Sequence, residues 1–416
     1  MSRYYDVVIT GGGASGLACS VIIKMHGEEI SVCILEQLNR VGKKLITTGN
    51  GRCNITNRNA EPSKYHGENA GFCRYALKNY DNFATEVFFN QLGIIFTYDS
   101  EGRAYPYSLQ ASSVVDALRF AAEEKGVEIF TEHAVTDVFK NESGYTVTAG
   151  GEKFKTPVFI AAGGLYSGGE KAGSNGSMLK ILEKLGYRTV KTTPAIVQIK
   201  TESALTRSLK GIKVNAKATL FCDGKPLRSE TGEVLFCDYG LSGPPVMQIS
   251  RETERKKGEK HIALDLMPEY DIQRVFDMIR YRKSVLSKRP LEEFFTGMLN
   301  KRVGQAIVKL SGLKLSDFSD TLTTDDIKRL AQNIKNLSFA VTGTAGFINS
   351  QVTAGGLDTS GFDDTTMMSE KDEGLFCIGE ILDIDGDCGG YNLQWAWSSA
   401  MCAADAVCEY LDGGKK

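Results

Sequence analysis

Three glycines near the N-terminus constrain the fold of this chain more than any other feature. Gly11, Gly13 and Gly16 give the spacing G-x-G-x-x-G. A short β-branched run (YDVVIT) ends directly before them, and the segment 14–26 that follows has the apolar spacing of a helix. A second apolar run, 30–35, completes a strand–helix–strand unit with parallel strands and a right-handed crossover. The chain is therefore predicted to begin with an α/β fold.

The glycine spacing and an acidic residue after the second strand together predict a nucleotide site. Gly11 permits the tight turn, Gly13 lets the backbone approach a pyrophosphate, and Gly16 lets the helix pack closely on the strand. The helix N-terminus offers amides and the positive end of a dipole to the phosphates. Glu36 follows Gly16 by twenty residues, where its carboxylate can accept hydrogen bonds from both ribose hydroxyls. We therefore predict that this end of the chain binds an adenine dinucleotide.

Composition limits the classes of protein and partner. The 416 residues exceed what one core usually serves, so two or three compact units are expected. A formal charge of -2 removes the electrostatic case for nucleic acid as the main partner. The N-terminal apolar stretch is too short for a signal peptide or a bilayer span, and the ten cysteines contain no C-x-x-C pair. We predict a cytoplasmic protein with neither a nucleic-acid nor a membrane partner, and its oligomeric state stays open.

Periodicity divides the rest of the chain into three parts. Helical patterns are followed by a β-meander and by a strand that returns to the first sheet, an order typical of FAD-type Rossmann domains. The helical patterns lie at 75–92 and 112–125, the stretches of the meander at 127–131, 134–139 and 144–149, the returning strand at 158–162, and a final helix at 393–411. The predicted domains are 1–191 with 346–416 for the nucleotide, a β-rich insert at 192–267 with 336–345 on the substrate side, and a helical subdomain at 268–335.

The C-terminal segment GLFCIGEILDIDGDCGGYNLQWAWSSA distinguishes between kinds of dinucleotide. A strand leads to Glu380, and after Asp385 the pair Gly389-Gly390 opens the last helix. The N-terminus of that helix could face N1 and O2 of a flavin, where negative charge appears on reduction. A glycine-capped turn before an ordinary amphipathic helix is the alternative, and for Trp395 and Trp397 a place in the core is the better interpretation. The segment favours FAD as the bound dinucleotide.

Basic residues directly follow the ribose-binding strand. Lys43, Lys44 and Arg52 are interleaved with glycines, Gly51 among them, and can reach a pyrophosphate or the pyrimidine edge of a flavin. An exposed polar loop is the alternative, and we favour cofactor contact. Cys53 could be a redox partner, but without a C-x-x-C neighbour a structural role is favoured.

Several long strings resemble a known family. They are GGGASGLACS, GKKLITTGNGRCNITN, FIAAGG, GLSGP, VTAGGL and GEILDIDGDCGGYNLQWAWSS, in this order over nearly the whole chain. They are similar to those of the bacterial FAD-binding family of aminoacetone-oxidase-like or BaiN-type NAD(P)/FAD-dependent oxidoreductases. The resemblance implies an α/β protein with an FAD-type Rossmann domain, an inserted β-barrel-like domain and a small helical subdomain. For members linked to bile-acid metabolism it implies reduction of a conjugated double bond in a 3-oxo steroid.

The resemblance also implies which residues hold FAD. Val135, at the end of the meander, and the helix start at Asn392 and Leu393 are among them. With the glycine pattern and immediate sequence neighbours, the predicted cofactor contacts are Gly11, Gly13, Ala14, Ser15, Gly16, Glu36, Gln37, Lys43, Lys44, Gly51, Arg52, Val135, Gly163, Glu380, Asp385, Gly390, Asn392 and Leu393.

One departure from the family affects the substrate side. Where the family has F-T-H-x-G before GLSGP, this chain has FCDYG at 236–240, so Asp238 stands in place of an expected histidine. An ordinary aspartate is ionised at neutral pH and cannot donate a proton, whereas a tyrosine hydroxyl can. Our hypothesis is that Asp238 is structural, capping the turn before GLSGP, and that a tyrosine or a bound water handles the proton. The catalytic residues stay unassigned, with Tyr239, Tyr391 and Asp238 as candidates and Tyr105 as a further hydroxyl near a family motif.

A single G-x-G-x-x-G leaves the source of electrons open. In one scheme NADH or NADPH docks transiently on the insert side, and FAD passes hydride to a small enone or steroid-like substrate. In the other, the substrate reduces FAD and oxygen reoxidises it, as in an amine- or aminoketone-type oxidase. We predict the reductase. A flavin-containing RNA-modification or binding protein is the alternative from another class, and the net charge disfavours it. The four histidines lack metal-ligand spacing, so no metal is predicted.

Overall fold

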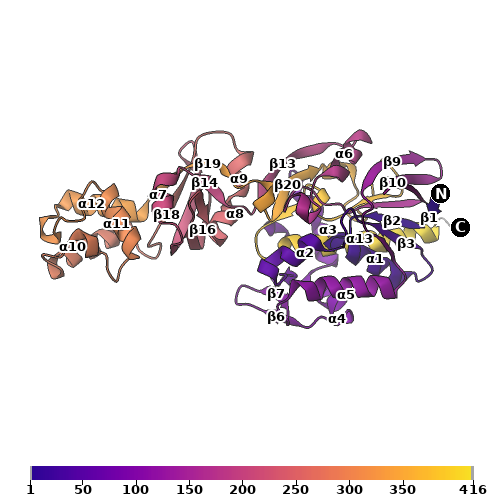
Figure 1. Ribbon diagram of the computed structural model, residues 1–416, viewed down its shortest axis with the longest axis horizontal. Helices are drawn as coiled ribbons and strands as arrows, with labels where there is room; N and C mark the ends of the chain where they lie inside the picture. The colour runs from indigo at the N-terminus through magenta and orange to yellow at the C-terminus, as the bar shows by residue number, and fades with distance from the viewer. Residues whose placement is uncertain (1, 414–416) are drawn as a thin grey trace. The chain divides into compact units, whose positions relative to one another are not determined.

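The computed structural model describes residues 2–413 (Figure 1). Residues 1 and 414–416, the outermost ends of the predicted nucleotide domain, lie outside the described part. The chain forms two compact units. Unit 1 runs to Pro194 and resumes at Phe347, and unit 2 is Ala195–Gly346.

A parallel five-stranded sheet forms the centre of unit 1. Its order is β21 (Leu375–Cys377), β12 (Val158–Ala161), β2 (Val7–Thr10), β3 (Val32–Leu35) and β8 (Glu128–Phe130). The first four strands are buried along their whole length, as their unbroken apolar runs require of a parallel sheet covered on both faces. The Rossmann-type fold predicted from the glycine pattern is confirmed.

Helices cover this sheet. The helix α1 (Ala14–His26) joins β2 to β3 and packs against α5 (Ala111–Glu124) and the C-terminal α13 (Tyr391–Gly413), which Figure 1 shows beside it. The remaining helices of unit 1 are α2 (Lys43–Thr47), α3 (Arg74–Asn79), α4 (Asn82–Gln91) and α6 (Ser177–Lys184). The single helical pattern predicted for 75–92 is divided, because Asp81 caps α4 by accepting a hydrogen bond from the Ala84 amide.

The β-meander differs from its prediction. The stretch predicted first, 127–131, supplies β8 at the edge of the parallel sheet instead. The meander consists of β9 (Val135–Asn141), β10 (Gly144–Ala149) and β11 (Glu152–Thr156), to which β1 (Ser2–Tyr4) adds in parallel. Three small sheets complete the unit: β4 (Thr56–Asn57) with β7 (Arg103–Pro106) and β6 (Phe96–Tyr98), β22 (Asp385–Gly386) with β5 (Tyr65–His66), and β13 (Thr189–Ala195) with β20 (Val352–Leu357).

Unit 2 contains a closed six-stranded barrel, which confirms the predicted barrel-like insert. Around the barrel the order is β14 (Ile199–Thr201), β17 (Gly240–Ser242), β16 (Lys225–Phe236), β15 (Lys213–Cys222), β18 (Lys260–Asp265) and β19 (Leu337–Thr344). Three helices lie between β18 and β19, namely α10 (Ile272–Val285), α11 (Lys301–Leu310) and α12 (Thr324–Lys335), and shorter ones are α7 (Ser203–Ser208), α8 (Pro244–Ile249) and α9 (Arg251–Arg255). Barrel strands and these helices share one hydrophobic core. Across residues 2–413, every helix is too short or too polar to cross a membrane.

Candidate functional site

The glycine turn between β2 and α1 has the shape of a phosphate-binding loop. Gly11 has φ +97°, and a Cβ there would lie 2.5 Å from the carbonyl oxygen of Ala162. A Cβ at Gly16 would collide with the carbonyl oxygen of Gly11. At Gly13, by contrast, a Cβ would meet nothing within 4 Å. Gly11 and Gly16 therefore allow close contacts between backbone segments. Gly13 leaves open space at the N-terminus of α1, where a pyrophosphate would fit.

Glu36 ties this turn to the end of β3. Its Oε2 accepts a hydrogen bond from the Gly12 amide and its Oε1 from the Leu38 amide, each at 2.8 Å. Burial raises the pKa of the Glu36 carboxyl, and these amides and the nearby Lys43 ammonium oppose that rise. Each carboxylate oxygen keeps a second lone pair, so the predicted ribose contact is compatible with these bonds. Glu36 thus positions the turn as well as being able to hold a ribose.

The turn also contacts segments that are distant in sequence. Ser15 is buried at the start of α1, and a Cβ at Gly379 would lie 2.6 Å from its hydroxyl. Gln37 accepts a hydrogen bond at 3.0 Å from the Asn175 side-chain amide. Ala14 begins α1, and Gly163 follows β12, opposite Met178 of α6. These predicted contacts therefore gather around the carboxyl ends of the parallel strands, where nucleotides bind in such sheets.

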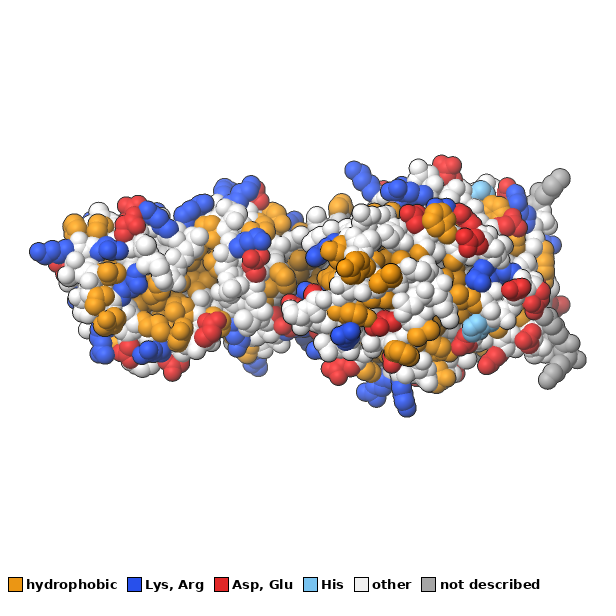
Figure 2. All heavy atoms as spheres, turned by 90° about the horizontal axis from the view of Figure 1, so that it is seen from below, with side chains coloured by type: hydrophobic (Ala, Val, Ile, Leu, Met, Phe, Trp, Pro, Cys, Tyr) orange, Lys and Arg blue, Asp and Glu red, His pale blue; other side chains and the backbone are white. Residues whose placement is uncertain are grey.

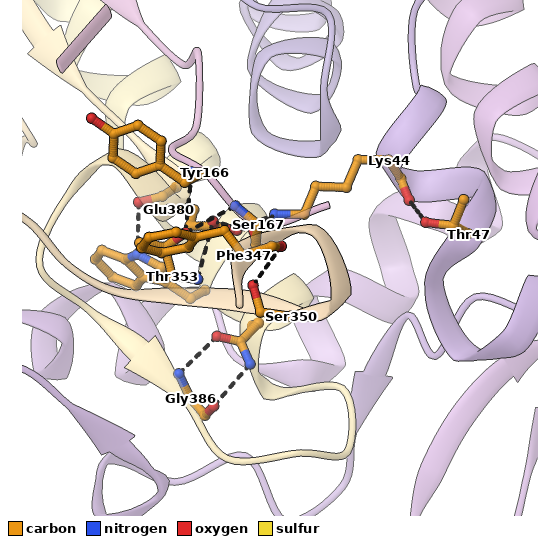
Figure 3. A network of polar contacts seen from close by, with 12 residues as sticks. Lys44, Thr47, Tyr166, Ser167, Phe347, Ser350, Thr353, Glu380 and Gly386 are labelled. Carbon is orange, nitrogen blue, oxygen red and sulfur yellow. Dashed lines mark hydrogen bonds and ion pairs between the residues drawn. The ribbon is translucent and has the colours of Figure 1, made fainter. Parts of the chain in front are cut away.

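Lys44 and Glu380, both predicted to touch the cofactor, are paired with each other (Figure 3). The Lys44 ammonium contacts the Glu380 carboxylate and the Ser167 hydroxyl. Ser167 donates to Glu380 Oε1 at 2.6 Å, and the Thr353 hydroxyl accepts from the Ser167 amide at 3.0 Å. The exposed fractions of the Lys44 and Glu380 side chains are 30% and 18%, so solvent and a ligand can still reach them.

This network contains two residues that were not predicted. Ser167 comes soon after the string FIAAGG, and Thr353 lies inside VTAGGL. Both strings carried the family resemblance, and polar side chains within or beside them were the available signal. The sequence does not show that these residues meet, because 123 positions separate Ser167 from Lys44 and 213 separate it from Glu380.

The C-terminal helix begins as predicted after a glycine pair. Gly390 has φ +98°, and a Cβ there would lie 2.7 Å from the Thr56 carbonyl oxygen. Asn392 holds the preceding turn, since its side chain accepts from the Gly386 amide at 2.8 Å and donates to the Gly386 carbonyl at 2.9 Å. Asp385 is buried in β22 opposite His66. Leu393, in the first turn of α13, is half-buried.

The tryptophans of this helix belong to the core, as predicted. Both are buried, and each indole N–H donates to a backbone carbonyl: Trp395 to Gly379 at 3.1 Å and Trp397 to Ile55 at 2.9 Å. These bonds fix α13 against the loop at Gly379 and against the segment before β4. The helix start is therefore held rigidly at its place in the site.

The loop after α2 is more exposed. Arg52 donates to the Gly49 carbonyl, and its guanidinium lies 5.1 Å from the ring centroid of Tyr105. Gly51 is exposed, and a Cβ there would meet nothing within 4 Å. Burial raises the pKa of Cys53 to about 12, so its thiol is protonated at neutral pH. This agrees with a structural rather than a redox role for Cys53.

Val135 requires a correction. It was placed at the end of the meander, but it is the first residue of β9 and pairs with Ala149 across β10. The stretch 134–139 is predicted as the second of three in the meander, and because 127–131 joins the parallel sheet, 134–139 is the first. Val135 is buried, and its contact with FAD stays a prediction.

The proton-donor candidates occupy different surroundings. Asp238 and Tyr239 belong to unit 2, and Tyr391 belongs to unit 1. A hydrogen bond from the Lys210 ammonium, 2.8 Å away, lowers the pKa of Asp238. Burial, followed by a hydrogen bond with Cys237, raises the pKa of Tyr239 to about 12. The backbone amides of Asp238 and Tyr239 also lower the pKa of Asp238, so the carboxylate interacts both with Lys210 and with the turn before GLSGP.

Tyr391 lines an open cavity of about 450 Å³. Its neighbours in the lining are Arg58, Asn59, Ala60, Glu61 and Lys64. Burial raises the pKa of Tyr391, so its hydroxyl is neutral at physiological pH. Tyr391 is also the first residue of α13, between the predicted flavin contacts Gly390 and Asn392.

Within residues 2–413 there is no group of three or more His, Cys, Asp or Glu side chains that could hold a metal ion.

Fold and site together define an FAD-dependent oxidoreductase. The profile of the family described as "HI0933-like protein Rossmann domain" matches residues 5–406, and the chain belongs to this family. Over 405 residues it is 34% identical to the 3-dehydro-bile acid delta(4,6)-reductase of Clostridium scindens, covering 96% of this chain and 98% of the relative. It is 31% identical to the ribosomal RNA dihydrouridine synthase of Escherichia coli over 413 residues, covering 97% and 98%.

A solved structure shares the architecture. The 3-ketosteroid-delta4-(5alpha)-dehydrogenase of Rhodococcus jostii superimposes with a TM-score of 0.50 at 14% identity, covering 98% of this chain and 97% of that one. At this identity the likeness extends to the fold alone. The predicted resemblance to BaiN-type oxidoreductases is confirmed by the family match and by the bile-acid reductase.

Proposed function

We propose that this protein reduces a carbon–carbon double bond conjugated with a carbonyl group, with NADH or NADPH as the electron donor. The observation that carries the proposal is that two relatives matching almost end to end are named for such reductions. In a 3-oxo steroid the delta(4) double bond is conjugated with the carbonyl. Dihydrouridine is uridine whose C5–C6 double bond, conjugated with the C4 carbonyl, has been reduced. The two substrates differ greatly, and the reacting group is the same.

Residues of unit 1 fit the needs of this chemistry. FAD, when bound, supplies the hydride transfer. The open space at Gly13 and the carboxylate of Glu36 would hold its pyrophosphate and ribose, and the N-terminus of α13 would offer amides to the flavin. Lys44 would place a positive charge near the cofactor, and its ion pair with Glu380 would partly neutralise that charge.

The second half of the reduction requires a proton for the carbon next to the carbonyl. We propose Tyr391 as its donor, because its hydroxyl is neutral and it lines a cavity at the start of α13. Asp238 is unsuited to this role, since Lys210 keeps it ionised at neutral pH. Tyr239 is the second choice, because it too keeps its proton throughout the physiological range.

Anaerobic titration of the purified yellow protein tests the proposal. NADH and NADPH are added in turn while the flavin absorbance is followed, and an enone such as a 3-oxo-delta(4) steroid is then added before air. We expect bleaching by a reduced nicotinamide and recovery of the oxidised flavin spectrum by the enone. Bleaching by an amine or aminoketone, with recovery only in air, would instead identify an oxidase.

Uridine in RNA is a second candidate substrate, and one observation favours it. Unit 2 carries 25 Lys and Arg against 18 Asp and Glu, a formal charge of +7, whereas the rest of the chain carries 24 against 33, a formal charge of -9. The small net charge of the whole chain hides this asymmetry, which is a feature of proteins that bind nucleic acid through one part. Figure 2 shows Lys and Arg side chains spread over the visible face of unit 2, interspersed with acidic ones.

Measuring flavin reoxidation at increasing salt concentrations distinguishes the two candidate substrates. RNA bound through phosphates would be released as the salt concentration rises, and a neutral steroid would not. Reoxidation of the reduced flavin by a uridine-containing ribosomal RNA fragment, falling steeply between 50 and 200 mM salt, would support RNA. Reoxidation by the steroid alone would exclude RNA as the substrate.

We further propose a cytoplasmic location, where the ten cysteines would stay reduced.

A further inference from the structure

Asn54 has a buried oxygen with no partner in the protein. It lies between the short helix η1 (Thr48–Gly51) and β4, and only 9% of the residue is exposed. Among residues 2–413, no donor forms a hydrogen bond with its Oδ1. Such an orphaned acceptor costs folding free energy, so most buried polar groups are paired. An unpaired one at a binding site points to a ligand that supplies the missing donor.

The Asn54 oxygen points at the start of α13. It lies 2.8 Å from the position that a Cβ at Gly390 would occupy. The helix begins one residue later, at Tyr391. The first N–H groups of a helix lack intrahelical acceptors and carry the positive end of its dipole. One acceptor without a partner therefore lies beside a group of donors, packed so closely against Gly390 that only glycine fits there.

This pattern is complementary to the pyrimidine edge of a flavin. That edge carries one N–H donor, at N3, between the two carbonyl acceptors O2 and O4. We infer that Asn54 Oδ1 accepts a hydrogen bond from N3–H of bound FAD, with the amides of α13 available to a flanking carbonyl. The inference rests on FAD as the cofactor and is independent of which substrate is reduced.

Asn57, in the same loop, has a different role and serves as a matched control. It is also buried, but its Nδ2 donates to the Gly389 carbonyl at 2.8 Å and its Oδ1 accepts from the Asn59 amide at 2.9 Å. Both ends of Asn57 are thus paired within the protein. Its removal should lower the thermal unfolding midpoint of the FAD-free chain. Removal of Asn54 should not lower it, because the oxygen that is deleted has no partner there.

The test compares FAD with 3-methyl-FAD, in which a methyl group replaces the N3 hydrogen. Wild-type, Asn54→Ala and Asn59→Ala chains are freed of FAD and titrated with each cofactor, and flavin fluorescence reports binding. Asn59 is an exposed residue of the same loop. We expect wild type and Asn59→Ala to bind 3-methyl-FAD about tenfold more weakly than FAD. Asn54→Ala should bind FAD about three- to tenfold more weakly than wild type and should not discriminate between the two cofactors.

Equal discrimination by wild type and Asn54→Ala would overturn the inference, as would a loss of FAD affinity in Asn54→Ala that merely follows a fall in the unfolding midpoint. A second readout uses FAD labelled with ¹⁵N at N3. The N3–H proton resonance should move upfield in Asn54→Ala and stay in place in Asn59→Ala. Neither measurement involves turnover, so a protein that fails to reduce enones would refute the proposed reaction and leave this inference testable.

Discussion

The two units of this protein follow different structural rules. In unit 1 the strands that form the nucleotide site are buried on both faces, and main-chain contacts fix its turns, as at Gly16. In unit 2 the barrel strands alternate, and β15 places one set of side chains in the core and the other toward solvent. A side chain added in the glycine turn of unit 1 therefore meets the backbone, whereas the outward side chains of β15 meet solvent. The two units should therefore respond differently to substitution.

The largest effect should come from adding a methyl group to the glycine turn of unit 1. Gly16→Ala forces a Cβ into the Gly11 carbonyl, so the backbone must move. We expect a loss of about 3 kcal/mol or more in the free energy of unfolding, at the upper end for overpacking, measured by urea denaturation. FAD should be lost during purification.

Gly13→Ala is the matched control for this experiment. Its new Cβ meets no protein atom within 4 Å, and the φ of Gly13, -86°, suits alanine. The unfolding free energy of the FAD-free chain should stay near that of wild type, while FAD binding weakens. Equal losses of stability in both variants would contradict the open space at Gly13, and unchanged FAD affinity in Gly13→Ala would show that this space has no role in binding.

The second prediction asks which unit supplies the proton. Tyr391→Phe keeps the ring that packs edge-on against Tyr65, at 6.2 Å between centroids, and removes only the hydroxyl. Reoxidation of the reduced flavin by an enone should slow about 100-fold, the usual scale of general acid catalysis. Flavin reduction by the nicotinamide should be unchanged, and stopped-flow absorbance separates the two half-reactions.

Tyr239→Phe tests the same step in unit 2. We expect near wild-type reoxidation from this variant. A 100-fold loss in Tyr239→Phe, with Tyr391→Phe unaffected, would transfer the proton donor to unit 2 and make that unit part of the catalytic centre rather than a variable surface.

The third prediction concerns Glu36, which joins the strand end to the glycine turn. Glu36→Ala leaves the buried Gly12 amide without its acceptor and removes the ribose contact. FAD binding should weaken by about 1 to 3 kcal/mol, measured by titration of the FAD-free chain. Unchanged FAD affinity would confine Glu36 to a structural role.

A smaller effect of the same carboxyl appears in the pH dependence of stability. Burial raises the pKa of Glu36 in the folded chain above its ordinary value of 4.5. A raised carboxyl pKa contributes stability that is fully present below the unfolded pKa and is lost as pH rises through the folded pKa. Wild type should therefore lose stability relative to Glu36→Gln as pH rises from about 4 to 7. Parallel thermal unfolding curves over that range would show that the pKa of Glu36 is ordinary.

Local physics explains which features could be predicted from the sequence. Helix α1 could be predicted with its observed ends because the glycine turn directly before it and the apolar spacing along its thirteen residues are both local signals. The Lys44–Glu380 pair was predicted as two separate cofactor contacts, because nothing in the sequence indicates that side chains 336 positions apart meet. The strand β8 was assigned to the meander because a short β-like run does not reveal which sheet it joins. Asn54 was missed because its lack of a partner is visible only in three dimensions.

The smallest expected effect belongs to Asp238, at the position where the family resemblance is weakest. The Lys210 ammonium donates to Asp238 at 2.8 Å, and both side chains are exposed to solvent. Because this bond lowers the pKa of Asp238, the carboxylate is ionised throughout the neutral range and has no proton to give. Asp238→Asn keeps the size of the side chain and an acceptor for Lys210 while removing the titratable group. Flavin reoxidation by substrate should stay near wild type and show the same pH profile between pH 6 and 9, roughly the window in which a general acid would reveal itself. A 100-fold loss with intact FAD and an unchanged unfolding midpoint would instead mean that substrate binding raises the pKa of Asp238 and makes it the proton donor in place of the family's histidine.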